Sequence, residues 1–271
     1  MAKQSNSQML LGKHAVVFGA GGSIGAAVAK EFAIEGAEVF LAGRTQSTVE
    51  DTAKQITIND GRAHAAVIDA LDDSRVNEYI DGIVKQTGNI DIVFNAVGPL
   101  AKEYGNGTNA VDLPIEQFIV PLATVVKSQF ITARVAARHM VKQHSGVIIF
   151  LTGSPARGHV TGATAIGTAF GAIESLMENL AVEVGPAGVR AVCLRTTANT
   201  DSRTIQQTME ALASQMNVRK DEMIARMASL NFLKVPASIS DTAKLAAFLA
   251  SDRARMMTGT VVNSTAGAAL D

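Results

Sequence analysis

The chain has 271 residues, a formal net charge of −1 and an apolar fraction of 47%, which is enough for one α/β domain with a sizeable core. A near-neutral chain without a basic run argues against nucleic acid as a main partner. The single Cys excludes an internal disulfide, and we expect a reducing, cytoplasmic location.

The N-terminal stretch MAKQSNSQMLLGKH is polar and lacks the apolar run that a signal peptide requires. No stretch of the chain approaches the ~20 continuous apolar residues of a membrane helix. We therefore expect a flexible tail over residues 1–9, one domain over residues 10–271, and no membrane partner.

The first half of the chain alternates short β-branched runs with longer amphipathic segments. Strands are predicted over His14–Gly19, Glu38–Ala42, Ala63–Asp69 and Ile90–Ala96. Helices are predicted over Ser23–Glu35, over Gln46–Asn59, and from an N-cap at Asp72 or Asp73 to Lys85.

The second half continues this alternation. Strands are predicted over Gly146–Thr152, Gly188–Leu194 and Gly259–Ser264, and helices over Ile115–Gln143, Gly162–Val184, the Met-rich stretch Asp201–Leu230, and Ser240–Ala250. Strands separated by helices form βαβ units, whose parallel strands are covered on both faces. The sequence therefore predicts a single α/β domain with a doubly wound parallel sheet and helices on both faces.

The stretch FGAGGSIGAA follows the first strand and opens the first helix. Glycines let the backbone turn sharply and approach a pyrophosphate, while the N–H groups and dipole of the helix start face its negative charge. A plain βα turn without a ligand is the alternative, but the strand–turn–helix context favours a dinucleotide. The residues predicted to hold it here are Gly19, Gly21, Gly22, Ser23, Ile24 and Gly25.

This turn resembles the Thr-Gly-x-x-x-Gly-x-Gly motif of the short-chain dehydrogenase/reductase family. Gly19 and Gly25 match its first and last glycines, with Phe18 in place of the Thr and Ser23 in place of the middle Gly. NAVG at 95–98 is similar to the family's Asn-Asn-Ala-Gly motif, and MTGTVVNSTAG at 257–267 to its C-terminal segment. The resemblance covers about residues 10 to 268 and implies a single-domain Rossmann-type fold.

The end of the second predicted strand bears on the choice of cofactor. An acid at this place binds the ribose hydroxyls of NAD(H) and repels a 2′-phosphate, whereas an Arg does the reverse. Gly43 replaces the acid, and Arg44 and Thr45 follow it, which favours NADP(H) over NAD(H); an ordinary surface Arg is the alternative. The resemblance adds further cofactor contacts at Asp69, Ala70, Asn95, Ala96 and Val97.

The resemblance also implies a catalytic set that this chain does not carry. The family uses a Tyr as proton donor, a Lys four residues later that lowers the Tyr pKa, a Ser that holds the carbonyl, and an Asn that supports a proton relay. In the family's spacing these places fall on Ile166, Phe170, Gly153 and Val125. Neither Tyr79 nor Tyr104 is followed by Lys at the fourth position, so the usual Tyr–Lys mechanism is absent.

Four polar residues near the carboxyl ends of the strands are candidate substitutes. Thr152 and Ser154 flank the place of the family's Ser, His159 lies in the loop after the fifth strand, and Tyr104 lies in the loop after the fourth. A His titrates near neutral pH, and ligands of open α/β sheets bind at this edge. A loop His is more often an ordinary surface residue, however, so a catalytic role requires the right geometry.

Two main hypotheses of function remain. The first is an NADP(H)-binding oxidoreductase with a non-standard active site and an unknown substrate, in which water or a loop residue could supply the proton. Hydride transfer to an activated carbon–carbon double bond would depend less on a dedicated Tyr. The second is a catalytically inactive cofactor-binding sensor, scaffold or partner subunit; a relative with a vestigial cofactor site is a third. A small molecule is the expected ligand, with no metal.

The resemblance further implies a lid and a subunit interface. Residues 201–230 correspond to a helical lid over the substrate, for which their Met content is suitable, although a helix pair packed on the domain is the alternative. The helices at 115–143 and 162–184 correspond to the face through which the family forms dimers and tetramers. Small residues at Gly167 and Gly171 permit close helix approach there.

Overall fold

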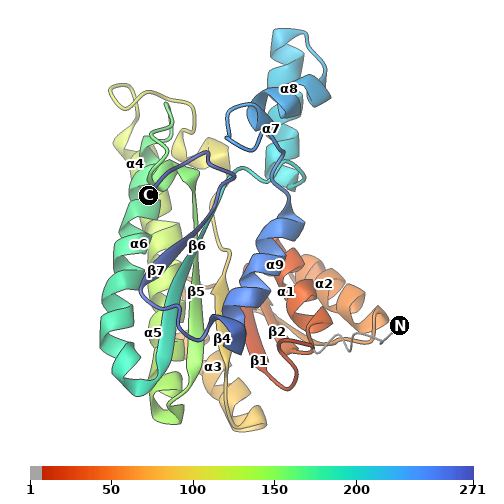
Figure 1. Ribbon diagram of the computed structural model, residues 1–271, viewed down its shortest axis with the longest axis vertical. Helices are drawn as coiled ribbons and strands as arrows, with labels where there is room; N and C mark the ends of the chain where they lie inside the picture. The colour runs from red at the N-terminus through yellow and green to blue at the C-terminus, as the bar shows by residue number, and fades with distance from the viewer. Residues whose placement is uncertain (1–7) are drawn as a thin grey trace.

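The computed structural model describes residues 8–271, without the side chains at 208, 211, 212, 214 and 215. Most of the predicted tail over residues 1–9 therefore lies outside the described residues. Seven parallel strands form one sheet in the order β3-β2-β1-β4-β5-β6-β7 (Figure 1). They are β1 His14–Phe18, β2 Glu38–Gly43, β3 Arg62–Val67, β4 Ile92–Asn95, β5 Gly146–Gly153, β6 Val189–Thr196 and β7 Thr260–Ser264.

Helices cover both faces of the sheet, which confirms the predicted doubly wound α/β fold. On one face α1 (Ser23–Ile34) contacts α2 (Gln46–Ile58) and α9 (Ile239–Ala250). On the other, α5 (Lys127–Gln143) contacts α3 (Asp73–Thr87) and α6 (Thr164–Val184). The strand order reverses between β1 and β4, and the crevice at such a reversal is where ligands of this architecture bind.

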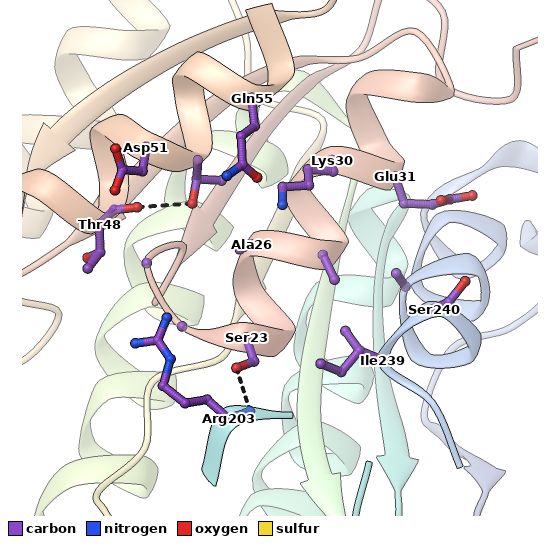
Figure 2. A pocket seen from close by; sticks show the side chains of 15 residues that line it. Ser23, Ala26, Lys30, Glu31, Thr48, Asp51, Gln55, Arg203, Ile239 and Ser240 are labelled. Carbon is purple, nitrogen blue, oxygen red and sulfur yellow. Dashed lines mark hydrogen bonds between the residues drawn. The ribbon is translucent and has the colours of Figure 1, made fainter. Parts of the chain in front are cut away.

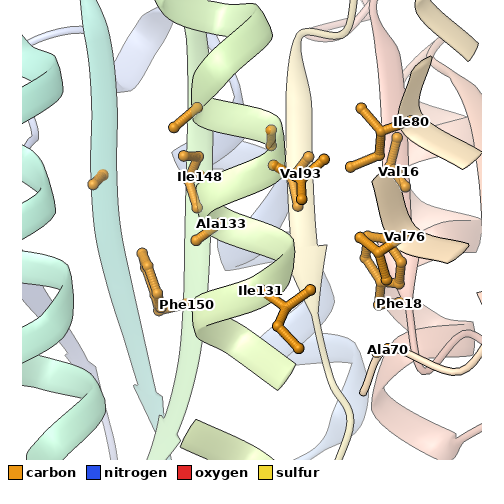
Figure 3. Packing of buried hydrophobic residues seen from close by; sticks show 14 of the residues in the cluster. Val16, Phe18, Ala70, Val76, Ile80, Val93, Ile131, Ala133, Ile148 and Phe150 are labelled. Atoms are coloured by element: carbon orange, nitrogen blue, oxygen red, sulfur yellow. The ribbon is translucent and has the colours of Figure 1, made fainter. Parts of the chain in front are cut away.

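Two apolar clusters, one on each face, hold the layers together. In Figure 3, Phe18 of β1, Val93 of β4 and Ile148 of β5 face the apolar side chains of α3 and α5. The alternate residues of the same strands, such as Val17 and Ile92, belong to the cluster beneath α1 and α9. Because both faces are buried, each central strand is an almost continuous apolar run.

The predicted helix over Ile115–Gln143 forms, but with an irregular centre. α4 (Ile115–Pro121) continues through a π-helical segment at Leu122–Val126 into α5. Pro121 cannot donate a ladder hydrogen bond, and the wider π turn follows it directly. By length and composition this run is the one helix among the described residues that could span a membrane, yet its inner face packs on the sheet as part of the core.

The predicted helical stretch Asp201–Leu230 is two helices, α7 (Arg203–Met216) and α8 (Lys220–Ala228). The break lies at Asn217, which adopts a left-handed backbone (φ 51°) and lets the Val218 N–H donate to the carbonyl of Ala213. This is a common way to end a helix. The two helices contact each other and project beyond the carboxyl ends of the strands (Figure 1).

Candidate functional site

A hollow of about 250 Å³ lies at the carboxyl ends of the strands, where β1 and β4 part. Its walls come from the turns after β1, β2, β3 and β4. Seven of the predicted cofactor residues line it: Gly19, Gly22, Arg44, Asp69, Ala70, Ala96 and Val97. The fold thus brings together residues spread over about eighty positions of the chain.

The glycine turn after β1 is a tight cradle. A Cβ on Gly19 (φ 75°) would lie 2.8 Å from the backbone carbon of Ala96, and a Cβ on Gly25 would overlap the carbonyl oxygen of Gly19. Gly22 is the N-cap of α1 and no side chain caps the helix, so the N–H groups of its first turn lack a side-chain acceptor. This arrangement fits the diphosphate of a dinucleotide.

The remaining predicted cofactor residues shape the site or lie at its edge. Asn95 is buried, donates to Thr132 Oγ1 (3.0 Å) and accepts from the Val97 N–H (2.8 Å), so it fixes the turn after β4. Thr45 is exposed at the N-cap of α2, without a side-chain capping bond. Gly21 and Ser23 line a second, neighbouring hollow, and Ile24 packs against the cluster beneath α1.

Gly43 and Arg44 end β2 at the wall of the 250 Å³ hollow. A Cβ on Gly43 would lie 2.7 Å from Val49 Cγ2, so the packing of α2 on this strand disfavours any side chain there. Arg44 is exposed, and it takes part in no ion pair among the described residues. Its guanidinium is therefore available to an anionic ligand.

The four positions to which the family resemblance assigns the catalytic set lie in an apolar region. Val125 and Ile166 are buried in the core, and the half-buried Phe170 packs against the same cluster. A Cβ on Gly153 would lie 2.9 Å from Phe170 Cε2, so the aromatic ring fills the space beside the end of β5. None of these four side chains can donate a proton.

The candidate substitutes differ in how accessible they are. Thr152 is only 1% exposed and its hydroxyl donates to Glu174 Oε1 (3.2 Å), so it faces the core. Ser154 Oγ lies 3.3 Å from Thr197 Oγ1 and links the ends of β5 and β6. His159 is exposed with a left-handed backbone (φ 48°). Tyr104 is half-buried, and this burial raises the pKa of its phenol.

The loops that carry Tyr104 and His159 meet, because the Gly107 N–H donates to the carbonyl of Gly162 (2.8 Å). Neither Tyr104 nor His159 is among the residues that line the 250 Å³ hollow. Glu103 and Thr124 do line it, and they were not among the sequence candidates. The π-helical segment places Thr124 there, and no local sequence pattern indicates that arrangement.

A buried ion pair lies behind Thr152 and was also missed from the sequence. Arg195 of β6 donates to Glu174 of α6 through Nε (2.8 Å) and Nη2 (2.9 Å), and each side chain is only 2% exposed. Arg195 also pairs with the C-terminal residue Asp271, and Arg157 lies 3.5 Å from Glu174. The sequence did hold a signal for this pair, because Glu174 and Arg195 are charged residues within otherwise apolar segments.

The same network surrounds the one Cys of the chain. Cys193 Sγ lies 3.3 Å from Thr152 Oγ1, and burial raises the pKa of the thiol to about 12. Burial lowers the pKa of Arg195, but its bonds to Glu174 and Asp271 raise it by more, so the guanidinium stays charged. The network is thus a satisfied structural element without a free nucleophile.

A second hollow, of about 550 Å³, lies between α1, α2 and α9 (Figure 2). It shares Gly22 with the first hollow, so the two meet at the glycine turn. Its polar lining residues include Ser23, Lys30, Thr48, Asp51, Arg203 and Ser240. Arg203 comes from the start of α7, far from the glycine turn in sequence.

Comparison with known proteins gives matches over nearly the whole chain. The sequence model of the family described as "Enoyl-(Acyl carrier protein) reductase" matches residues 19–269. A protein of Euphorbia lathyris named "Short chain aldehyde dehydrogenase 1" is 26% identical over 271 residues, covering 95% of this chain and 88% of the relative. A Bacillus subtilis protein named "Probable 2,4-dienoyl-CoA reductase" is 29% identical over 265 residues, covering 94% and 96%.

Solved structures share the fold at lower identity. L-Sorbose reductase from Gluconobacter frateurii, complexed with NADPH and L-sorbose, superposes with a TM-score of 0.87. The identity is 21%, and the superposition covers 96% of this chain and 98% of the other. The architecture is therefore retained across proteins whose side chains have largely changed.

Proposed function

Because the chain belongs to the short-chain dehydrogenase/reductase family, we propose that it is an NADP(H)-binding oxidoreductase with a non-standard active site. The observation that carries the cofactor part is the pair at the end of β2. Gly43 leaves no acid there, and Arg44 lines the hollow with a guanidinium that forms no ion pair within the described part of the chain. A guanidinium of this kind pairs well with a phosphate group.

Different residues of the chain would bind different parts of the dinucleotide. The uncapped first turn of α1 would hold the diphosphate, Arg44 and Thr45 the 2′-phosphate, and Asp69 and Ala70 the adenine. The turn at Asn95, Ala96 and Val97 would support the nicotinamide end. When bound, the nicotinamide supplies hydride exchange with a carbon of the substrate.

The proton must come from a group other than the family's Tyr. Ile166 and Phe170 are apolar, so water, Ser154, His159 or Tyr104 would have to supply it. Addition of hydride to an activated carbon–carbon double bond depends less on a dedicated donor than reduction of a carbonyl does. The name of the B. subtilis relative, a probable dienoyl-CoA reductase, supports this reaction type.

A catalytically inactive cofactor-binding protein is the second candidate function. The contact between Gly153 and the ring of Phe170 favours it, because this contact fills the space beside the strand end with carbon. A sensor, scaffold or partner subunit would keep the glycine cradle and need no proton donor. The cofactor prediction is common to both candidates.

Two measurements separate these candidates. NADPH and NADH are first titrated into the protein, and lack of binding of either at submillimolar concentration would refute both. A panel of enoyl thioesters and small carbonyl compounds then follows, read by loss of NADPH absorbance. Steady consumption with any substrate supports the oxidoreductase, whereas binding without consumption across the panel supports the inactive protein. His159→Ala and Tyr104→Phe then test the two loop donors.

We also propose the lid and the interface that the resemblance implies. α7 and α8 project beyond the carboxyl ends of the strands (Figure 1), and Arg203 at the start of α7 lines the 550 Å³ hollow beside the glycine turn, which suits a lid. The outer faces of α5 and α6 expose Phe130 and Val182, at 45% and 77%, which suits burial against another copy in a dimer or tetramer. Analytical ultracentrifugation of the purified protein measures its molecular mass in solution and so tests the dimer or tetramer.

A further inference from the structure

Arg203 lies where the projecting helices meet the glycine turn. It is the first residue of α7, and its backbone N–H donates to Ser23 Oγ at the start of α1 (3.1 Å), across 180 positions of sequence. In Figure 2 the Arg203 side chain extends from this bond toward the turn that precedes Ser23. The hydrogen bond thus anchors the base of the lid beside the phosphate cradle.

Two arginines that form no ion pair among the described residues lie on either side of this turn. Arg44 lines one hollow and Arg203 the other, and the two hollows meet at Gly22. Neither guanidinium takes part in an ion pair among the described residues. Glu31 and Asp51 line the same hollow as Arg203, but neither lies within ion-pair distance of it. Two cations therefore flank a helix start that already attracts anions.

We propose that Arg203 binds a phosphate group of the dinucleotide and that the Ser23 hydroxyl positions Arg203 for this contact. The inference rests on the proposed cofactor function and extends it to a residue of the lid. A guanidinium offers several N–H donors in a plane and suits phosphate oxygens better than an ammonium does. Ser23, which replaces a glycine of the family motif, then has a specific use: its side chain holds the backbone of Arg203.

A consequence for the lid follows. Because Arg203 opens α7, a phosphate held by its side chain would fix the first turn of that helix. Cofactor binding and order in the lid are then coupled through one residue. If the lid moved independently of the cofactor, the contact between Arg203 and a phosphate would have no effect on its order.

The first test compares wild type with Arg203→Gln by calorimetric titration of NADPH and NADH. Loss of a charged hydrogen bond to phosphate is expected to raise the Kd at least tenfold, about 1.4 kcal/mol. Weaker binding of NADPH alone assigns the 2′-phosphate to Arg203, and weaker binding of both nucleotides assigns the diphosphate. Arg226→Gln, an exposed Arg in α8, is the matched control and should bind as wild type does.

Unchanged Kd values for both nucleotides in Arg203→Gln would overturn the inference while leaving the proposed function intact. Failure of the wild type itself to bind either nucleotide would instead refute the proposed function. Thermal unfolding of Arg203→Gln without nucleotide, compared with that of wild type, shows whether the variant is correctly folded. If Arg203→Gln is unstable, Arg203→Met takes its place, because it keeps a long side chain without the charge, and the same tenfold criterion applies to it.

The positioning role of Ser23 has its own readout. Ser23→Ala should weaken NADPH binding, and the double variant with Arg203→Gln should bind no more weakly than Arg203→Gln alone. Additive losses would show that Ser23 acts independently of Arg203. Hydrogen exchange of residues 203–207 should also slow on NADPH addition in wild type but not in Arg203→Gln; equal slowing in both would contradict the coupling.

Discussion

The ring of Phe170 occupies the space that a side chain at position 153 would need, since a Cβ on Gly153 would lie 2.9 Å from Phe170 Cε2. Gly153 ends β5 and Phe170 lies on α6, so the contact determines how closely this helix approaches the strand end. Positions 153 and 170, which the resemblance assigns to the family's Ser and Lys, therefore form one packing arrangement. Restoring either group alone would disturb the other.

Gly153→Ser is expected to lower the free energy of unfolding by about 1–3 kcal/mol, because it overpacks this contact. In the background of Phe170→Ala the same change should cost much less, so the two effects are non-additive. Urea denaturation of the four proteins measures the coupling. Gly82→Ser in α3 is the control, since a Cβ there meets no atom within 4 Å. Additive costs at 153 and 170 would contradict the packing account.

Arg44→Ala should weaken NADPH binding by roughly 1.5–3 kcal/mol, the usual worth of a hydrogen bond to a charged group, while leaving NADH binding nearly unchanged. The reason is that only NADPH carries the 2′-phosphate that this guanidinium would meet. Parallel titrations with both nucleotides measure the difference. Arg62→Ala, an exposed Arg of β3, serves as the control. An equal loss for both nucleotides would argue against a 2′-phosphate contact.

Glu174→Gln is expected to destabilise the protein by about 3–5 kcal/mol, because it leaves the buried Arg195 guanidinium without its main counter-charge. The readout is the urea midpoint at unchanged m-value. Glu178→Gln on the exposed side of the same helix should have little effect. A midpoint for Glu174→Gln close to that of wild type would mean that the pair is not isolated from water.

The C-terminal Asp271 predicts a pH dependence of stability. Its hydrogen bond to Arg195 holds the pKa of this carboxylate below its ordinary value of 3.8. The unfolded chain therefore binds the proton first as the pH falls, so the stabilisation is complete above pH 3.8 and is lost below it. Asp271→Asn should make unfolding less dependent on pH in that acidic range. Asp112→Asn is the control, because this exposed carboxylate forms no ion pair with any residue that the structure describes. Identical pH profiles for wild type and Asp271→Asn would refute the linkage.

The alternation of strands and helices was predictable because each buried strand is a short apolar run bounded by turn residues. The element ends were less predictable. The sixth strand extends to Thr196 and does not stop at Leu194. In the sequence a charged Arg195 indicates the end of a buried strand, but in the structure its charge is paired with Glu174, so the strand continues through it. The break in the Met-rich stretch was visible only in Asn217, a residue suited to a left-handed helix end.

Some features of the candidate site were likewise predictable from the sequence, and others were not. The sequence by itself determined the glycine turn, the absence of an acid at Gly43 and the absence of a Tyr followed by Lys at the fourth position, because each depends only on residue types at short spacings along the chain. Only the tertiary structure decided that Phe170 fills the space beside Gly153, that Arg195 is neutralised by Glu174, and that Arg203 lies against Ser23. Those contacts join residues 17 to 180 positions apart, and the packing of whole helices on the sheet brings them together.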